Sequence, residues 1–285
     1  MGKGLFRQRQ IAGWQGLTCL RCKQNVLNRL SLMELSIVIP ARNEAPNVAP
    51  LIAEIRAALD GIADYEIIYI DDGSSDDTAD AVRTAMADGR VRLVRHAKSG
   101  GQSAAVRSGV IAARTPWIAT LDADGQNDPA DIRKLWELAR STPNAEKLLL
   151  AGYRQKRRDT AIKRVSSRIA NRVRGAMLKD HTPDTGCGLK LLRRDLYLAL
   201  PFFDHNHRFL PALVLREGGN VQSVAVNHRP RQRGKSNYGT LDRLFVGIVD
   251  LFGLMWLQHR AKVPVLLSEE QASGAAPLRN TGTRA

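Results

Sequence analysis

The chain has 285 residues, of which 44% are hydrophobic, and its 43 Lys and Arg against 28 Asp and Glu give a formal charge of +15. This length and composition suit one large globular domain, and the charge favours an anionic partner such as a membrane surface, a phosphorylated ligand or nucleic acid. Three cysteines are too few for a disulfide framework, and no apolar run is long enough and free enough of charge to predict an obvious membrane span.

The first 32 residues are basic, rich in glutamine and without a clear hydrophobic period. They lack the continuous apolar run of a signal peptide, so we expect a disordered extension over 1–32 before a folded domain that starts at Met33. Within this extension, Cys19 and Cys22 have the spacing of half a zinc site or of a redox pair. No second Cys or His pair follows nearby, which favours an incidental pair.

From Met33 onward, strand-like apolar runs alternate with segments of helical period. Strands are predicted at 35–40, 66–70, 91–96, 117–121 and 147–153, and helices at 46–61, 74–89, 101–114 and 128–140. This alternation predicts a single α/β domain over 33–240, with a mostly parallel central sheet covered by helices on both faces. Ligands of such sheets bind at the carboxyl ends of the strands, where the acidic and glycine-rich segments of this sequence fall.

Beyond residue 153 the sequence becomes strongly basic. A helical stripe of apolar side chains with a row of arginines beside it predicts a basic amphipathic helix, a form that binds anionic membrane surfaces or phosphates. The stripe comprises Ile162, Val165, Ile169, Val173 and Met177, and the row comprises Arg164, Arg168 and Arg172. After a short strand at 221–226 and a basic loop at 228–239, we expect an amphipathic, membrane-associated helical segment at 241–267 and a disordered tail at 268–285.

Two carboxylates, Asp122 and Asp124, directly follow the apolar strand at 117–121. Hard oxygen ligands of this kind hold Mg²⁺ or Mn²⁺, and such a cation neutralises the charge that develops when a nucleoside diphosphate leaves. Gln126 is a candidate further ligand. The alternative is a loop whose acidic residue caps the next helix.

A second acidic turn, DDGSSDDT, follows the strand at 66–70 and places Asp72 where it could accept hydrogen bonds from a nucleotide base or ribose. The alternative is a turn that caps the following helix, and both roles can hold together. The segment KSGGQSAAVRSG, with Gly101 at the start of a helix, resembles a phosphate-binding loop. It lacks the Gly-Lys-Ser/Thr ending of a P-loop and the GxGxxG pattern, which argues against a dinucleotide-binding oxidoreductase.

The remaining polar side chains give weaker signals. Few aromatic residues interleave with the basic segments, which argues against binding of single-stranded nucleic acid. His205 and His207 could form a metal pair, but an ordinary surface or capping role for each is favoured.

Taken together, seven segments of the sequence resemble the family 2 glycosyltransferases. They are LSIVIPARNEAPNV, EIIYIDDGSSDDT, HAKSGGQSAAVRSG, LDADGQNDP, GYR, DTGCGLKLLRRD and RQRGKSNYG, in this order. Within the family they are most similar to the polyprenyl-phosphate sugar synthases of the dolichyl-phosphate mannose and glucose synthase type. The resemblance implies a GT-A fold and an inverting transfer of a sugar from a UDP- or GDP-linked donor to a polyprenyl phosphate of the undecaprenyl or dolichyl type.

The resemblance also implies roles for particular residues. The residues implied for the nucleotide-sugar pocket are Pro40, Asn43, Glu44, Asp72, Gly101 and Asp122, and those implied for a Mg²⁺ or Mn²⁺ ion are Asp122, Asp124 and Gln126. Those implied for the acceptor or donor phosphates are Arg154, Arg168, Arg231 and Ser236, with Asp184 in the acceptor region. Asp124, Asp184, Arg154 and Arg168 would take part in catalysis. Because a phosphate monoester has its second pKa near 6, the acceptor is mostly dianionic at neutral pH and needs little help from a base.

Two departures from the family pattern bear on this interpretation. Gly188-Leu189-Lys190 stands where the family commonly has Gly-Phe-Arg or Gly-Phe-Lys, so an aromatic contact is missing. Many relatives carry carboxy-terminal transmembrane helices, whereas the apolar segment at 241–257 is short and contains Asp250. We therefore expect peripheral attachment to the inner, cytoplasmic face of the cell membrane. A GT-A enzyme with a non-lipid acceptor and a non-catalytic basic membrane-surface binder stay open, as do the sugar and the oligomeric state.

Overall fold

The computed structural model describes residues 33–154, 174–230 and 240–262, and over 240–246 it describes the backbone alone. Several expectations concern segments outside the described residues: the extension at 1–32 with Cys19 and Cys22, the tail at 268–285, and most of the basic amphipathic helix. Among the site residues that the family resemblance implies, those outside the described part are Arg168, Arg231 and Ser236.

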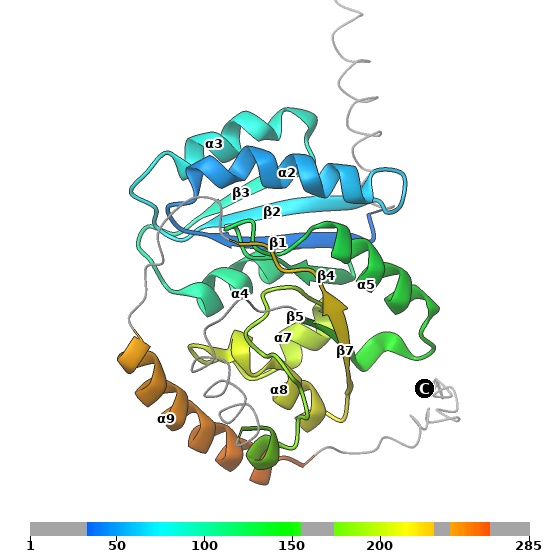
Figure 1. Cartoon of the computed structure of the whole chain (residues 1–285), viewed down its shortest axis with the longest axis vertical. Helices are drawn as coiled ribbons and strands as arrows, with labels where there is room; N and C mark the ends of the chain where they lie inside the picture. The colour runs from blue at the N-terminus through cyan, green and yellow to red at the C-terminus, as the bar shows by residue number, and fades with distance from the viewer. Residues whose placement is uncertain (1–32, 155–173, 231–239, 263–285) are drawn as a thin grey trace, which may run out of the picture.

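In the described part of the chain, seven strands form one mixed sheet in the order β3-β2-β1-β4-β6-β5-β7 (Figure 1). The strands are β1 (Leu35–Ala41), β2 (Tyr65–Asp71), β3 (Val91–Arg95), β4 (Trp117–Thr120), β5 (Leu148–Arg154), β6 (Lys190–Arg193) and β7 (Asn220–Val226). All neighbouring pairs run parallel except those of β6, which is antiparallel to both β4 and β5. The predicted mostly parallel α/β fold is confirmed.

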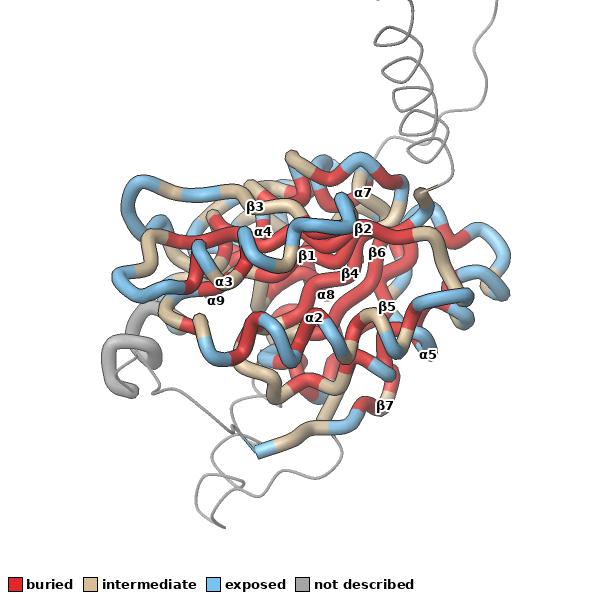
Figure 2. The backbone as a smooth tube through the Cα atoms, turned by 90° about the horizontal axis from the view of Figure 1, so that it is seen from above, coloured by how far each residue is buried: buried red, intermediate tan, exposed pale blue. Residues whose placement is uncertain are grey.

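The central strands are buried on both faces, as Figure 2 shows for β1, β2, β4 and β6. Side chains of β1 alternate between two apolar cores, with Ile37 and Ile39 in one and Val38 in the other. Burial on both sides explains why these strands have continuous apolar runs rather than an alternating apolar and polar pattern.

Helices cover both faces of the sheet. The first core lies beneath α2 (Ala45–Leu59), α3 (Thr78–Thr84) and α5 (Ala130–Ser141), and the second beneath α4 (Gln102–Ala112), α7 (Arg194–Ala199), α8 (Leu210–Arg216) and α9 (Thr240–His259). The described ranges also contain three short 3₁₀ helices: η1 (Ala85–Asp88), η2 (Ala145–Lys147) and η3 (Asn206–Arg208). The helix predicted at 74–89 is divided between α3 and η1, and the other three predicted helices are confirmed to within two residues at each end.

Strand β6 is the main element that the sequence analysis did not predict. It has four residues, with Lys190 and Arg193 at its ends, so its apolar signal is only two leucines long. It pairs with β4 and β5, and it therefore brings the segment before Lys190 against the carboxyl end of β4.

Helix α9 lies along the outside of the domain (Figure 1). Leu254 is buried against the second core, and Leu251 and Met255 pack against it in part. The opposite side of the helix exposes Ile248, Val249, Phe252 and Trp256, and Trp256 retains 64% of its accessible surface. No helix within the described ranges combines the length and apolar character needed to cross a membrane.

Candidate active site

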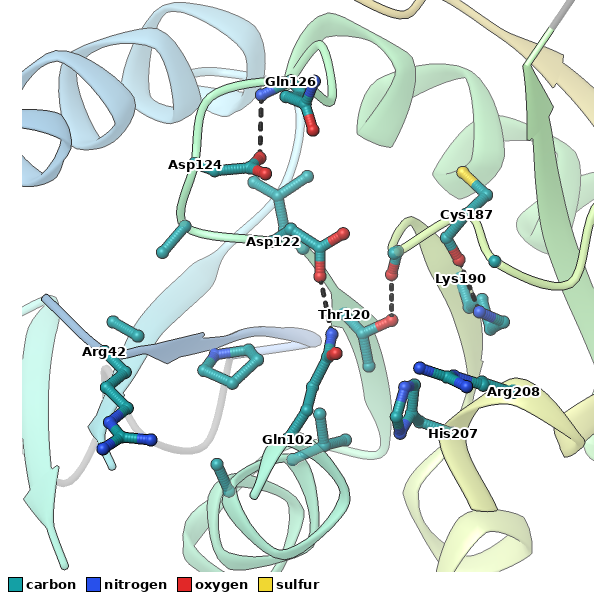
Figure 3. A pocket seen from close by; sticks show the side chains of 18 of the residues that line it. Arg42, Gln102, Thr120, Asp122, Asp124, Gln126, Cys187, Lys190, His207 and Arg208 are labelled. Atoms are coloured by element: carbon teal, nitrogen blue, oxygen red, sulfur yellow. Dashed lines mark hydrogen bonds between the residues drawn. The ribbon is translucent and has the colours of Figure 1, made fainter. Parts of the chain in front are cut away.

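A cavity of about 660 Å³ opens at the carboxyl ends of β1, β2 and β4 (Figure 3). Seven of the residues that the sequence analysis assigned to a site line it: Pro40, Glu44, Asp72, Asp122, Asp124, Gln126 and Arg154. The parallel register explains this, because Ala41 of β1 lies opposite Asp71 of β2, and Val38 lies opposite Thr120 of β4. The loops that leave these three strands therefore meet at one edge of the sheet, as expected for an α/β fold.

Asp122 points into the cavity, with its carboxylate held from two sides. The side-chain amide of Gln102, the first residue of α4, donates a hydrogen bond to Oδ1 at 2.9 Å. On the other side Asp122 contacts Gly188 so closely that a Cβ atom there would lie 2.1 Å from Oδ2. Gly188 is held in turn by Thr120, whose hydroxyl donates to its carbonyl at 2.6 Å. Gly188 is thus required by the position of the carboxylate.

The environment of Asp122 opposes its negative charge. Burial, and then the charge of Asp124, raise the pKa of Asp122 to about 6, although Lys190 and Arg154 act in the opposite direction. A carboxylate whose proton affinity is raised by burial and by a neighbouring carboxylate favours a cation beside it. Oxygen donors at a strand end suit Mg²⁺ or Mn²⁺, so the residues present fit a divalent ion.

Asp124 and Gln126 lie on the other side of the loop from Gln102 (Figure 3). The backbone N–H of Gln126 donates to Oδ1 of Asp124 at 3.0 Å, which fixes that carboxylate at the cavity wall. In the described part of the chain, no group of three or more His, Cys, Asp or Glu side chains could hold a metal. A cation here would therefore take its remaining ligands from the Gln126 amide, water or substrate oxygens.

Asp72 lines the cavity and also organises the glycine-rich loop. Its carboxylate accepts hydrogen bonds from Gly100 N at 2.7 Å, Gly101 N at 3.0 Å and Ser99 Oγ at 2.7 Å, and Nδ1 of His96 lies at 2.7 Å. Burial acts to raise the pKa of Asp72, but these hydrogen bonds outweigh it and hold the pKa below its usual value. Asp72 is thus an ionised residue that connects the turn after β2 to the start of α4.

The loop after β1 is bonded to the turn after β2. Asn43 has a left-handed backbone, with φ of 57°, and its side-chain oxygen accepts a hydrogen bond from the backbone N–H of Ser75 at 2.9 Å. The backbone N–H of Glu44 donates to the hydroxyl of Thr78 at 2.9 Å. Asn43 and Gly101 are not among the residues that line the cavity, although their neighbours in the sequence, Glu44 and Gln102, are.

Arg154 and Asp184 form a bidentate ion pair at the edge of the cavity. Nε and Nη2 of the guanidinium donate to the two carboxylate oxygens at 2.6 and 2.8 Å, and the backbone N–H of Arg154 also donates to Oδ2 at 3.3 Å. Arg154 lines the cavity, whereas Asp184 is not among the lining residues. Because both of its oxygens accept from the guanidinium, Asp184 holds the Arg154 side chain in one orientation.

The cavity is also lined by polar residues that the sequence analysis did not assign to the site, among them Gln102, Lys190, His207 and Arg208. Lys190 is buried, donates to the carbonyls of Thr185 and Cys187, and has its pKa lowered by burial. His207, for which a surface or capping role was favoured, is one of the residues that line the cavity.

The arrangement of strands, with a cavity and acidic side chains at their carboxyl ends, is that of the GT-A fold. Solved structures with this fold include glucosyl-3-phosphoglycerate synthase from Mycobacterium tuberculosis in complex with Mn²⁺, UDP and glucosyl-3-phosphoglycerate, with a TM-score of 0.59 and 19% identity, covering 90% of this chain and 88% of that one. Mannosyl-3-phosphoglycerate synthase from Rubrobacter xylanophilus gives a TM-score of 0.61 and 17% identity, covering 89% and 80%.

The chain belongs to glycosyl transferase family 2, whose family model matches residues 36–200. It is 35% identical over 240 residues to dodecaprenyl-phosphate galacturonate synthase from Rhizobium johnstonii, covering 81% of this chain and 69% of the relative. It is 30% identical over 218 residues to undecaprenyl-phosphate 4-deoxy-4-formamido-L-arabinose transferase from Aeromonas hydrophila, covering 75% and 66%. The chain thus spans about two thirds of the length of these relatives. The predicted family is confirmed.

Proposed function

We propose that this protein transfers a sugar from a nucleotide-diphosphate sugar to a polyprenyl phosphate at a membrane surface, with inversion at the sugar and with a divalent cation, Mg²⁺ or Mn²⁺. The observation that carries this proposal is the cavity that brings Asp122, Asp124, Asp72 and Arg154 together at the edge of the sheet. Relatives named for transfer to dodecaprenyl and undecaprenyl phosphate support the lipid acceptor.

The donor would occupy the side of the cavity between β1 and β2. Pro40, Glu44 and Asp72 would bind its nucleoside, while Asp122, Asp124 and Gln126 would hold the cation. When bound, the cation would supply charge neutralisation for the diphosphate leaving group. The contribution of the chain is positional: Gln102 and Gly188 fix the Asp122 carboxylate before any substrate arrives, and such preorganisation lowers the cost of reorganising the site during the reaction.

The acceptor would bind at the Arg154 side of the cavity. A dianionic phosphate is itself a nucleophile, so the protein needs to overcome its repulsion from the donor diphosphate rather than to remove a proton. Arg154, oriented by Asp184, supplies positive charge at this edge. Arg168, Arg231 and Ser236 belong to the same proposed phosphate site on the strength of the family resemblance.

Helix α9 is the proposed membrane contact. Its exposed face presents Ile248, Val249, Phe252 and Trp256, and the chain carries a net charge of +15. A helix with an apolar face on a basic protein fits an anionic lipid surface, where apolar burial and electrostatic attraction act together. The proposed location is therefore the cytoplasmic face of the membrane, with peripheral attachment.

The direct test is incubation of the purified protein with undecaprenyl phosphate, Mn²⁺ and a panel of radiolabelled UDP- and GDP-sugars. The proposal predicts that label from one donor enters the organic phase, and that Asp124→Ala abolishes the transfer while the protein remains folded. Label that is transferred to water-soluble acceptors alone would instead identify a GT-A enzyme with a non-lipid acceptor. Binding to anionic vesicles without any binding of sugar nucleotides would identify a non-catalytic membrane binder.

A further inference from the structure

His207 and Ser103 form a contact between two elements that are far apart in the sequence. His207 lies in η3 and its side chain lines the cavity beside Arg208 (Figure 3). Ser103 is the second residue of α4, and its side chain is fully buried. Ser103 Oγ lies 2.7 Å from Nδ1 of His207 and accepts a hydrogen bond from the backbone N–H of His207 at 3.3 Å.

These two distances settle which ring nitrogen carries the proton of the neutral imidazole. The backbone N–H of His207 can only donate, so Ser103 Oγ accepts that bond. Within the described part of the chain, Ser103 Oγ has hydrogen bonds with these two nitrogens alone. Its own proton must therefore point to Nδ1, because a buried hydroxyl that donates to nothing is costly. Nδ1 is then an acceptor, and the imidazole proton is on Nε2.

We infer that His207 contacts a phosphate oxygen of a bound substrate through Nε2–H, an inference that rests on the proposed function. A neutral N–H is a donor to anionic oxygen and offers no lone pair to a cation. The cation would be held on the Asp122 and Asp124 side, whereas His207 lies beside Arg208, a second group that attracts anions. The phosphate is either the diphosphate of the donor or the monoester of the acceptor.

Ser103 is a positioning residue in this arrangement. If Nε2 were instead a metal ligand, the proton would move to Nδ1, and Ser103 Oγ would receive two donors while its own proton had no acceptor. The buried serine thus selects the tautomer whose proton is on Nε2. The bond to His207 also fixes η3 against the first turn of α4, the turn from which Gln102 reaches Asp122.

The tautomer is measurable without any turnover. In protein labelled with ¹⁵N at histidine, long-range proton–nitrogen NMR correlations distinguish Nε2–H from Nδ1–H, and His207→Gln assigns the signal among the six histidines. At a pH at which the ring is neutral, we expect the Nε2–H form in the wild type and loss of this preference in Ser103→Ala. A dominant Nδ1–H form in the wild type overturns the inference.

Kinetics then test the contact and its source. We expect His207→Ala to lower kcat/KM about 10- to 100-fold, because it removes one hydrogen bond to a charged group, and His207→Gln to recover part of this loss. The Mn²⁺ concentration for half-maximal rate should not change. A raised KM for the sugar nucleotide identifies the diphosphate as the partner, and a raised KM for undecaprenyl phosphate identifies the acceptor.

His205→Ala is the matched control, because His205 pairs with Asp204 and Asp250 and does not line the cavity, although its ring centroid lies 6.5 Å from that of His207. A loss equal to that of His207→Ala, or no loss in His207→Ala, overturns the inference. So does a raised Mn²⁺ requirement in His207→Ala. A wild type that transfers no sugar would refute the proposed function instead, and the NMR experiment would still decide the tautomer.

Discussion

Gly188→Ala is expected to disable the site through one added carbon atom. The backbone at Gly188 is not left-handed, so the effect is steric: the new Cβ would lie 2.1 Å from Oδ2 and 2.3 Å from Cγ of Asp122. Atoms that are not bonded approach to about 3.5 Å, so the carboxylate must withdraw by roughly 1 Å or more. That movement breaks its hydrogen bond with Gln102 and displaces it from the cation.

The size of the effect follows from two sources. Overpacking a close contact costs about 1–3 kcal/mol, which corresponds to a Tm lower by about 2–10 °C in a domain of this size. Displacement of a site group by about 1 Å lowers the rate by about 10²-fold. Sugar transfer, Mn²⁺ titration and thermal unfolding measure these quantities. Gly253→Ala on α9 is the control, because a Cβ atom there meets nothing within 4 Å. Normal turnover and Mn²⁺ requirement in Gly188→Ala would refute the reasoning.

Three further predictions concern charge and the membrane face. Because the pKa of Asp122 is raised to about 6, its carboxylate holds a proton in the folded, metal-free protein that the unfolded chain releases, and this contribution to the free energy of unfolding falls as pH rises from about 4 to 6. Mn²⁺ must displace that proton, so its affinity measured by calorimetry should fall about tenfold per pH unit below 6. A flat profile would count against Asp122 as a ligand. Asp124→Asn should lower transfer at least about 10²-fold with little change in Tm, and near-normal turnover would exclude its role with the cation. Replacing both Phe252 and Trp256 with serine should abolish sedimentation of the protein with anionic vesicles. Phe202→Ser changes an exposed aromatic residue outside α9 and should leave sedimentation unchanged. Equal binding of both variants to the vesicles would exclude α9 as the membrane contact.

The sequence allowed the acidic part of the site to be predicted because that part depends on local order. Asp72, Asp122 and Asp124 each follow an apolar strand directly, and parallel strands bring such positions to one edge of the sheet. This rule alone was enough to place the three carboxylates together, without knowledge of the loop conformations.

The other side of the cavity depends on contacts that sequence patterns do not contain. Lys190 enters the site because β6 runs antiparallel between β4 and β5, and a strand of four residues with two charged ends gives little signal. His207 reaches Ser103 across 104 residues, through the packing of η3 against α4. On this side of the cavity, the one feature that the sequence showed locally was Gly188, which lies in the segment that resembles the family pattern, just before the departure at Leu189. In the structure, the carboxylate of Asp122 leaves no room for a side chain at Gly188.

The central claim is that a cation between Asp122 and Asp124 binds the diphosphate of a sugar donor, and crystals grown with UDP and Mn²⁺ test it most directly through anomalous scattering. The account predicts one Mn²⁺ peak in the cavity, about 2.0–2.5 Å from oxygens of this acidic pair and of the diphosphate. A diphosphate bound in the cavity with no Mn²⁺ peak beside either carboxylate, at a pH well above 6, would contradict it.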